Sequence, residues 1–177
     1  DFQNIAAIGF NAIRLTMNYA VFENDLDPGV YLEDGWTWLD RVVSLAKDAG
    51  LYLLLDMHAP QGGYQSDKQQ GFAAFWDDDG NPPNTSNQDR LIGLWTAIAE
   101  RYEHEPVVAG YDLINEPRPN DSEEWFLFAE QIIAAIRSVD SNHLIVVEAP
   151  FIPGYSMRTV SDGNVLYDSH FYYTWGY

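Results

Sequence analysis

The chain has 177 residues, of which 46% are hydrophobic and 15% aromatic, so it can bury a sizeable core and does not have the composition of a disordered segment. Its 27 Asp and Glu against 9 Lys and Arg give a formal net charge of −18, which disfavours nucleic acids and anionic membrane surfaces, because both are bound mainly by clustered basic residues. No apolar run reaches the roughly 18 residues of a membrane span, and the absence of cysteine excludes disulfides and thiolate metal sites.

Five short apolar runs alternate with helical patterns along the chain. The runs cover residues 11–17, 51–57, 107–114, 143–148 and 164–170. Several are nearly continuous in Val, Ile, Leu and aromatic residues, which is typical of parallel strands covered by helices. The sequence therefore predicts a parallel sheet.

Three helices are predicted between these strands from apolar faces at helical spacing. Gly50 follows the first at the position of a left-handed cap, and the third opens with Asp121 and Glu124 at capping-box spacing. Residues 1–8 are interpreted as the end of an earlier helix. The three apolar faces consist of Leu39, Val42, Val43 and Ala46, of Leu91, Leu94, Trp95, Ile98 and Tyr102, and of Trp125, Phe128, Ile132 and Ile136.

Alternating strands and helices form either an open doubly wound sheet or a closed eightfold barrel. No Gly-rich phosphate loop follows a strand here, which weakens the nucleotide-binding version of the open sheet. Reactive and sugar-binding types of side chain follow the strands instead, as they do on the active-site face of a (β/α)8 TIM barrel. They are Asn18 and Tyr19, His58, Asn115 and Glu116, Glu148, and His170 and Tyr172. These strand ends favour the barrel.

Residues 59–88 form a long polar and aromatic loop, and a loop of this length in a compact domain is usually functional. Its "DDDGN" (77–81) resembles the start of a calcium-binding loop. Gln88 stands where the bidentate Glu of such a loop is required, so an exposed acidic turn is favoured and no metal site is expected.

The run "DLINEP" (112–117) ends a strand on an amide, a carboxylic acid and a proline. It could be simply a polar exit turn. A carboxylic acid fixed beside an amide can also protonate a glycosidic oxygen while the amide holds a sugar hydroxyl. On this interpretation Glu116 is the proton donor, Asn115 binds the sugar 2-hydroxyl, and Pro117 stiffens the exit from the strand. A glycosidase needs a second carboxylate, about 5 Å away in retaining enzymes and farther in inverting ones.

Four motifs in the same order make the chain resemble glycoside hydrolase family five, the cellulase-type barrels of clan A. They are "GFNAIRLTMNY" (9–19), "GLYLLLDMHAP" (50–60), "VAGYDLINEP" (108–117) and "SHFYY" (169–173), and "NHLIVVE" (142–148) fits the strand between the last two. The resemblance covers residues 1–177 but only strands two to six of the family barrel. It implies a single catalytic-domain fragment, a partial barrel lacking the first, seventh and eighth strands.

The resemblance implies roles for the residues at the strand ends. Arg14 orients and charge-stabilises the nucleophile, His58 lines the subsite of the reacting sugar, and Glu116 is the general acid and base with Asn115 as its 2-hydroxyl partner. Each has a structural alternative: Arg14 could pair with Asp56, and a lone histidine at a strand end could be a hydrogen-bonding residue without a role in catalysis.

The sixth-strand motif adds His170 and Tyr172, which by the same resemblance support the two carboxylates. Aromatic residues near the expected active face could stack on sugar rings. These are Tyr19, Phe22, Tyr64, Trp76 and Trp175, whereas Trp38, Trp95 and Trp125 lie at helical spacing and are expected in the core.

In the family, the nucleophile is a Glu that ends the seventh strand, and a Trp that ends the eighth strand lies under the reacting sugar. The resemblance ends after the sixth strand, so the nucleophile is expected outside this chain. Glu148 at the end of the fifth strand is an alternative nucleophile, against a role at the rim or in substrate contact. The 177 residues alone are expected to be inactive unless the parent chain or a companion chain supplies the missing strands, and their open edges invite self-association.

The resemblance therefore implies a secreted, endo-acting, retaining β-glycan hydrolase that needs no cofactor. β-1,4-Glucan is the favoured substrate, and mannan or another β-glucan is the alternative. A second hypothesis is a truncated barrel that folds, pairs its open edges and at most binds β-glycan without cleaving it.

Overall fold

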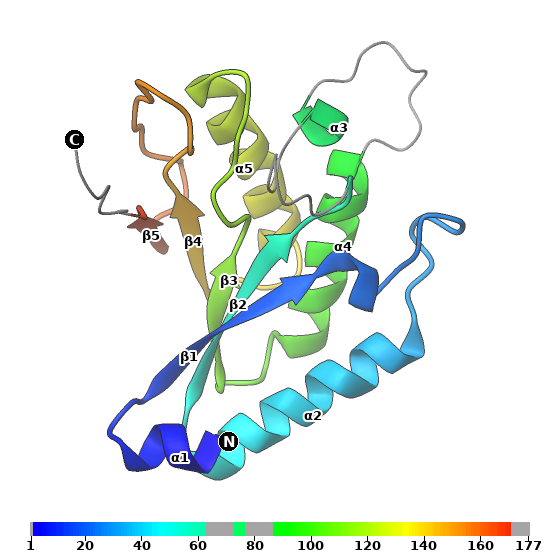
Figure 1. Cartoon of the computed structure of the whole chain (residues 1–177), viewed down its shortest axis with the longest axis vertical. Helices are drawn as coiled ribbons and strands as arrows, with labels where there is room; N and C mark the ends of the chain where they lie inside the picture. The colour runs from blue at the N-terminus through cyan, green and yellow to red at the C-terminus, as the bar shows by residue number, and fades with distance from the viewer. Residues whose placement is uncertain (1, 63–72, 77–86, 171–177) are drawn as a thin grey trace, which may run out of the picture.

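The computed structural model describes residues 2–62, 73–76 and 87–170. Within these residues, five parallel strands form one sheet in the order β1-β2-β3-β4-β5, so each strand pairs with the one before it in the sequence (Figure 1). The strands are β1 (Ala12–Asn18), β2 (Tyr52–Ala59), β3 (Val108–Asp112), β4 (Leu144–Glu148) and β5 (Val165–Asp168). The predicted parallel sheet is confirmed.

One helix precedes the sheet, and helices connect its first four strands. They are α1 (Phe2–Ala7), the short 3-10 helix η1 (Tyr19–Val21), α2 (Glu33–Ala49), α3 (Ala73–Trp76), α4 (Asn87–Tyr102) and α5 (Ser122–Arg137). Helices α4 and α5 pack against each other beside the sheet (Figure 1). The three long helices and α1 lie where the sequence predicts them, whereas η1 and α3 are too short to produce a periodic signal.

The helix boundaries follow the predicted signals. Gly50 ends α2 in the left-handed conformation with a φ of 69°, which glycine adopts without steric cost. The side chain of Asp121 accepts the Glu124 N–H at 2.9 Å, and the Glu124 side chain accepts the Asn120 N–H at 2.7 Å. Local sequence thus determines where α2 ends and where α5 begins.

Two indole rings tie the long helices to the carboxyl ends of the strands. Trp95 of α4 donates from Nε1 to the Leu113 carbonyl at 3.0 Å, and Trp125 of α5 donates to the Glu148 carbonyl at 2.8 Å. Both rings are fully buried, so each combines a large apolar contact with a satisfied N–H group. The ends of β3 and β4 are therefore held in place by the core.

Side chains along each strand alternate between the two faces of the sheet. Leu53, Leu55 and Met57 of β2 belong to the hydrophobic core and are fully buried. The intervening positions include Asp56, which the strand register places beside Asp112 of β3. Acidic side chains from neighbouring strands are thus brought together on the face opposite that core.

Strands β3 and β4 approach closely at Gly110. A Cβ atom at this position would lie 2.3 Å from the carbonyl oxygen of Leu144 and 2.8 Å from the Leu144 Cβ. Glycine is therefore required for the close pairing of these two strands.

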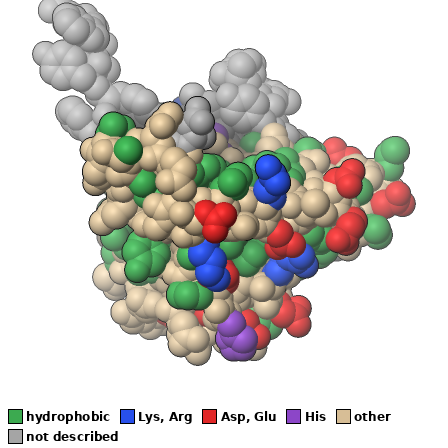
Figure 2. Space-filling model, turned by 90° about the horizontal axis from the view of Figure 1, so that it is seen from below, with side chains coloured by type: hydrophobic (Ala, Val, Ile, Leu, Met, Phe, Trp, Pro, Cys, Tyr) green, Lys and Arg blue, Asp and Glu red, His purple; other side chains and the backbone are tan. Residues whose placement is uncertain are grey.

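Figure 2 shows the molecule from below, where the strands begin. On this face acidic side chains lie beside Lys and Arg, and basic residues do not gather into a patch.

Of the helices in the described residues, none has the length and hydropathy that crossing a bilayer requires.

Candidate active site

The sequence-predicted polar and charged residues that the structure describes converge at the carboxyl edge of the sheet. Arg14 comes from β1 and His58 from β2, whereas Asn115 and Glu116 directly follow β3. Glu148 ends β4, and His170 lies two residues beyond β5. The contacts below link these side chains into one network.

The guanidinium of Arg14 is the centre of this network. Its Nε donates to Asp112 Oδ2 at 2.7 Å, and its Nη1 lies 3.0 Å from Asp56 Oδ2. Its Nη2 donates to Glu148 Oε1 at 2.5 Å and to Asn115 Oδ1 at 3.1 Å. Arg14 therefore pairs with Asp56, the structural alternative considered above, and also reaches three residues at the ends of β3 and β4.

Three buried carboxylates share this one guanidinium. Burial, reinforced by the charge of Asp56 and opposed by Arg14, raises the pKa of Asp112 to about 7. Burial and the charge of Asp112 also raise the pKa of Glu148. The pKa of Arg14 is itself raised: burial lowers it, but the charges of Asp112 and Asp56 outweigh that effect. The cluster thus retains a proton near neutral pH.

Hydrogen bonding indicates where that proton is held. Both oxygens of Glu148 already accept N–H groups, from Arg14 and from the backbone of Glu116. Within the described residues, Asp112 Oδ1 and Asp56 Oδ1 are buried without a hydrogen-bond partner. A proton on Asp112 Oδ1 turns an acceptor that lacks a partner into a hydroxyl donor, whereas a proton on Glu148 would compete with an N–H group already bound there. We therefore assign the proton to Asp112 in preference to Glu148.

Glu116 has an unusual backbone conformation. Its φ of 46° makes it the one non-glycine residue with positive φ among the described residues. Its N–H donates to Glu148 Oε2 at 2.6 Å, and its Oε1 lies 2.8 Å from His170 Nδ1. Such a conformation costs about 1–2 kcal/mol and persists where surrounding contacts impose it, which is common at functional sites.

His170 links two acidic side chains. Its Nδ1 faces Glu116, and its Nε2 lies 3.4 Å from Glu148 Oε1. Burial lowers its pKa, but the hydrogen bond that its Nδ1 donates to Glu116 and the charge of Glu148 outweigh this and raise it overall. The imidazolium form is therefore favoured between the two carboxylates.

His58 is the more open histidine of the site. Its Nδ1 lies 2.9 Å from Asp56 Oδ2, and 36% of its side chain is exposed. The contact with Asp56 fixes the orientation of the ring and leaves Nε2 as the nitrogen that can meet a ligand.

A model of the Cellulase family, glycosyl hydrolase family 5, matches residues 1–177. The chain belongs to glycosyl hydrolase family 5. Curated relatives include endoglucanase C of Acetivibrio thermocellus, 31% identical over 97% of this chain and 49% of the relative. A beta-xylosidase of Phanerodontia chrysosporium is 34% identical over 80% of this chain and 29% of the relative. The chain thus spans half or less of the length of these family 5 relatives.

Solved structures share the fold. Endoglucanase Cel5A of Thermotoga maritima superimposes with a TM-score of 0.74 at 22% identity, covering 94% of this chain and 50% of that one. An endogalactoceramidase gives 0.76 at 23% identity, covering 97% and 49%. At such identities the likeness shows the fold alone. It confirms the predicted fold class, an α/β family 5 barrel that is present here as five strands of a partial barrel.

The aromatic residues predicted to stack on sugars are placed differently. Trp76 of α3 is only 5% exposed, and its ring meets those of Trp125 and Phe128 at nearly right angles. A ring enclosed in this way offers no open face, so this position does not fit the predicted stacking role. Phe22 is fully buried and Tyr19 nearly so.

Several predicted residues lie outside the described part of the chain. They are Tyr64, Tyr172, Trp175 and the acidic run 77–81. Their roles stay predictions.

Glu148 is buried where β4 ends. Its side chain is 2% exposed, and both of its oxygens accept N–H groups. The roles considered for it from the sequence stay predictions. Glu148, Asp168 and His170 could offer a metal three ligand atoms within 4.8 Å of one another. Both oxygens of Glu148 already accept N–H groups, from Arg14 and from the backbone of Glu116, so we assign no metal to this group.

Sequence reasoning missed the central role of two carboxylates. Asp112 was not singled out, and Asp56 was considered only as a partner of Arg14. Each interrupts an apolar strand with a charged residue, and buried charges are rare unless they are paired. That interruption was the available signal.

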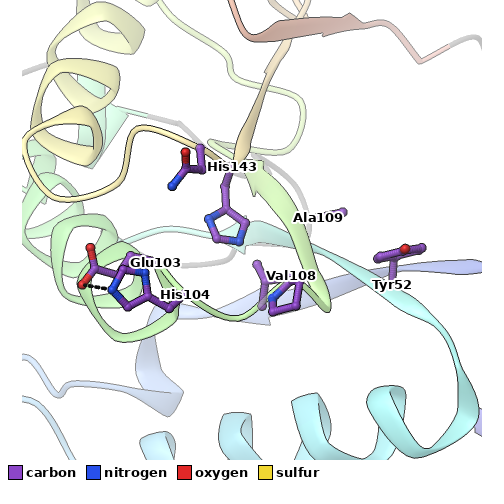
Figure 3. Close-up of a pocket in the computed structure, with 8 residues that line it drawn as sticks. Tyr52, Glu103, His104, Val108, Ala109 and His143 are labelled. Atoms are coloured by element: carbon purple, nitrogen blue, oxygen red, sulfur yellow. Dashed lines mark ion pairs between the residues drawn. The ribbon is translucent and has the colours of Figure 1, made fainter.

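A separate hollow of about 680 Å³ lies where the strands begin, at the opposite edge of the sheet (Figure 3). Tyr52, Val108 and His143 line it together with His104, which forms an ion pair with Glu103 at 3.4 Å. None of the residues of the Arg14 network lines this hollow.

Proposed function

We propose that this family 5 chain carries the acid and base side of an endo-acting, retaining β-glycan hydrolase. The observation that carries the proposal is the Glu116 carboxyl, held by His170 at the strand-end edge beside Arg14 and Asn115. In this proposal Glu116 is the general acid and base, and the nucleophile is a carboxylate supplied from outside residues 1–177, at the seventh strand of the family barrel.

The reaction proceeds by double displacement. Glu116 donates its proton to the glycosidic oxygen while the nucleophile attacks the anomeric carbon, so the leaving sugar departs as an alcohol and a glycosyl-enzyme ester forms. The ionised Glu116 then takes a proton from a water molecule, which attacks the anomeric carbon and releases the nucleophile. Glu116 ends the cycle protonated.

Asn115 is suited to bind the 2-hydroxyl group of the sugar. Its Oδ1 accepts a hydrogen bond from Arg14 at 3.1 Å, which fixes the orientation of the amide. The Nδ2 group is then the donor that the side chain can offer to a sugar oxygen. Arg14 acts here through Asn115 and also places positive charge beside the reacting carboxylates.

The substrate class rests on the relatives. Several are named endoglucanases, which supports β-1,4-glucan as the substrate. Others are named beta-xylosidase and probable glucan 1,3-beta-glucosidase, so a xylan or another β-glucan is the alternative. Mannan remains a third candidate from the sequence. Because such polymers do not enter cells, we also propose that the protein is secreted.

The test is Glu116→Gln in the full-length protein, assayed on aryl cellobiosides. Turnover of substrates with poor leaving groups should fall by about 10²–10⁴-fold, the usual contribution of a general acid. Substrates with activated leaving groups need little protonation, so their first step should be nearly unchanged, and azide should restore turnover by forming a β-glycosyl azide.

Glu100→Gln is the matched control, because Glu100 is an exposed residue in the last turn of α4, which leads to Glu103 and His104 at the edge of the sheet where the strands begin. It should leave both kinds of substrate unaffected. Equal losses on poor and activated leaving groups in Glu116→Gln would refute the assignment of Glu116.

A further inference from the structure

The carboxylate of Glu148 contacts groups from three other parts of the fold. Its Oε1 accepts from Arg14 Nη2 of β1 at 2.5 Å and lies 3.4 Å from His170 Nε2 beyond β5. Its Oε2 accepts the backbone N–H of Glu116 at 2.6 Å. With its side chain 2% exposed, Glu148 is placed to hold other residues and not to meet a substrate directly.

We propose that Glu148 is a positioning residue for the hydrolytic reaction. It fixes the backbone of Glu116 through the N–H group and fixes the Glu116 carboxyl through His170. The inference rests on the proposed role of Glu116 as general acid and base.

The backbone contact explains how Glu116 keeps its left-handed conformation. Beyond β3, the N–H of Leu113 donates to Val146 of β4, and the N–H of Asn115 donates to Met57 of β2. The next N–H, that of Glu116, turns to the Glu148 side chain. A hydrogen bond to a charged acceptor contributes more than one to a neutral carbonyl, so it offsets the conformational cost of a φ of 46°.

The second contact acts on the proton of the site. His170 lies between the carboxyl groups of Glu116 and Glu148, and its Nε2 is also 3.9 Å from Asp168 Oδ2. The positive charge of Arg14 opposes protonation of the ring. Removing the charge of Glu148 therefore weakens the hold on the imidazolium, and with it the hydrogen bond that orients Glu116.

Glu148→Gln is the direct test. Arg14 and the Glu116 N–H donate to different oxygens of Glu148, and in glutamine one of these oxygens is replaced by an NH₂ group, which faces one of the two donors and cannot accept from it. In the full-length protein, kcat on a cellobioside with a poor leaving group should fall about tenfold or more, a part of the 10²–10⁴-fold that general acids supply. KM should change less than kcat. By NMR, the titration midpoint of the His170 ring should move to lower pH.

Glu148→Asp is the companion variant. It keeps the negative charge but shortens the side chain by one methylene, so the His170 midpoint should stay near that of the unchanged protein. Part of the lost kcat should return. The NMR measurement needs no turnover and tests the contact even in protein of low activity.

Glu23→Gln is the matched control for burying an amide in place of a carboxylate. Glu23 is fully buried and accepts from Arg90 Nε at 2.7 Å, from the backbone N–H of Gly29 at 2.9 Å and from Gln61 Nε2 at 3.2 Å. It should lower the Tm without moving the His170 midpoint or the dependence on the leaving group.

Three outcomes would overturn the inference. One is a folded Glu148→Gln protein with unchanged kcat and an unchanged His170 midpoint, and another is a loss that Glu23→Gln reproduces in every measurement. The third is an α-glycosyl azide formed by Glu148→Gln, which would make Glu148 the nucleophile. If Glu116→Gln leaves leaving-group dependence intact, the proposed function fails separately, while the His170 titration still reports on Glu148.

Discussion

The guanidinium of Arg14 and the three buried carboxylates of Asp56, Asp112 and Glu148 are not balanced in charge. Removing charges from water is costly, and one cation cannot compensate three ionised carboxylates in a poorly solvated site, which is why the cluster retains a proton. A core built for stability alone would contain fewer charges. The arrangement costs stability and holds several hydrogen-bonding groups at fixed positions on the edge where the strands end.

This imbalance predicts how stability depends on pH. In the folded chain the pKa of Asp112 is raised from 3.8 to about 7. The folded state therefore binds more protons than the unfolded state between these values, and the stabilisation from the bound proton is lost as the pH rises from about 4 through about 7. The buried Glu148, whose pKa is also raised, changes stability in the same direction.

Asp112→Asn removes the titration of this residue. The fall in Tm between pH 5 and pH 8 should be smaller in the variant than in the unchanged protein. The exposed Asp48→Asn should leave that difference as it was. Parallel Tm curves for Asp112→Asn and the unchanged protein would show that Asp112 is ionised throughout this range.

At the scale of strands and helices, the sequence predicts most of the fold. The five runs of Val, Ile, Leu and aromatic residues become β1 to β5, and apolar faces at helical spacing become α2, α4 and α5. Gly50 and Asp121 end and begin helices as their residue types predict. These signals are local, because each depends on neighbours within about one or two helical turns.

The contacts between distant elements were less predictable. Arg14 meets Asp112 and Glu148 across 98 and 134 residues, and these pairings depend on strand register, which no local pattern reveals. The positive φ of Glu116 follows from the same contacts, since glutamate has no intrinsic preference for it. The burial of Trp76 depends on the same kind of distant contact, because its ring packs against Trp125 and Phe128 of α5.

The pairing of β3 with β4 gives a prediction for Gly110→Ala. The added methyl group would meet the Leu144 backbone, which cannot move without disturbing β4. Overpacking of this kind costs about 1–3 kcal/mol or more, so the midpoint of urea unfolding should fall clearly. Gly163→Ala is the control, because a Cβ there meets nothing within 4 Å. Equal midpoints for the two variants would mean that β3 and β4 have room to separate.

At the scale of the whole molecule, the two edges of the sheet determine whether the 177 residues alone associate with further copies of the chain. Within the described residues β1 and β5 each pair with one neighbour, and an open edge is a template for pairing with another chain. We therefore expect the isolated 177-residue protein to self-associate and, in the absence of the proposed nucleophile, to leave carboxymethyl cellulose and aryl cellobiosides uncleaved.

Light scattering after gel filtration measures the first expectation, and reducing-sugar release measures the second. A full-length protein is the positive control for activity. A 177-residue monomer of verified mass that hydrolyses either substrate would contradict both expectations and would place the nucleophile within this chain.

The sequential order of the sheet also bears on synthesis. Because each strand pairs with the one before it, the sheet can grow from its amino-terminal side as the chain leaves the ribosome. Arg14 then emerges first, and the growing chain brings its acidic partners one at a time: Asp56 with β2, Asp112 with β3 and Glu148 with β4. Arg14 is thus present in the nascent chain before any of its three acidic partners. If the ribosome pauses before β4 is made, the N–H of Glu116 has no Glu148 side chain to which it can donate.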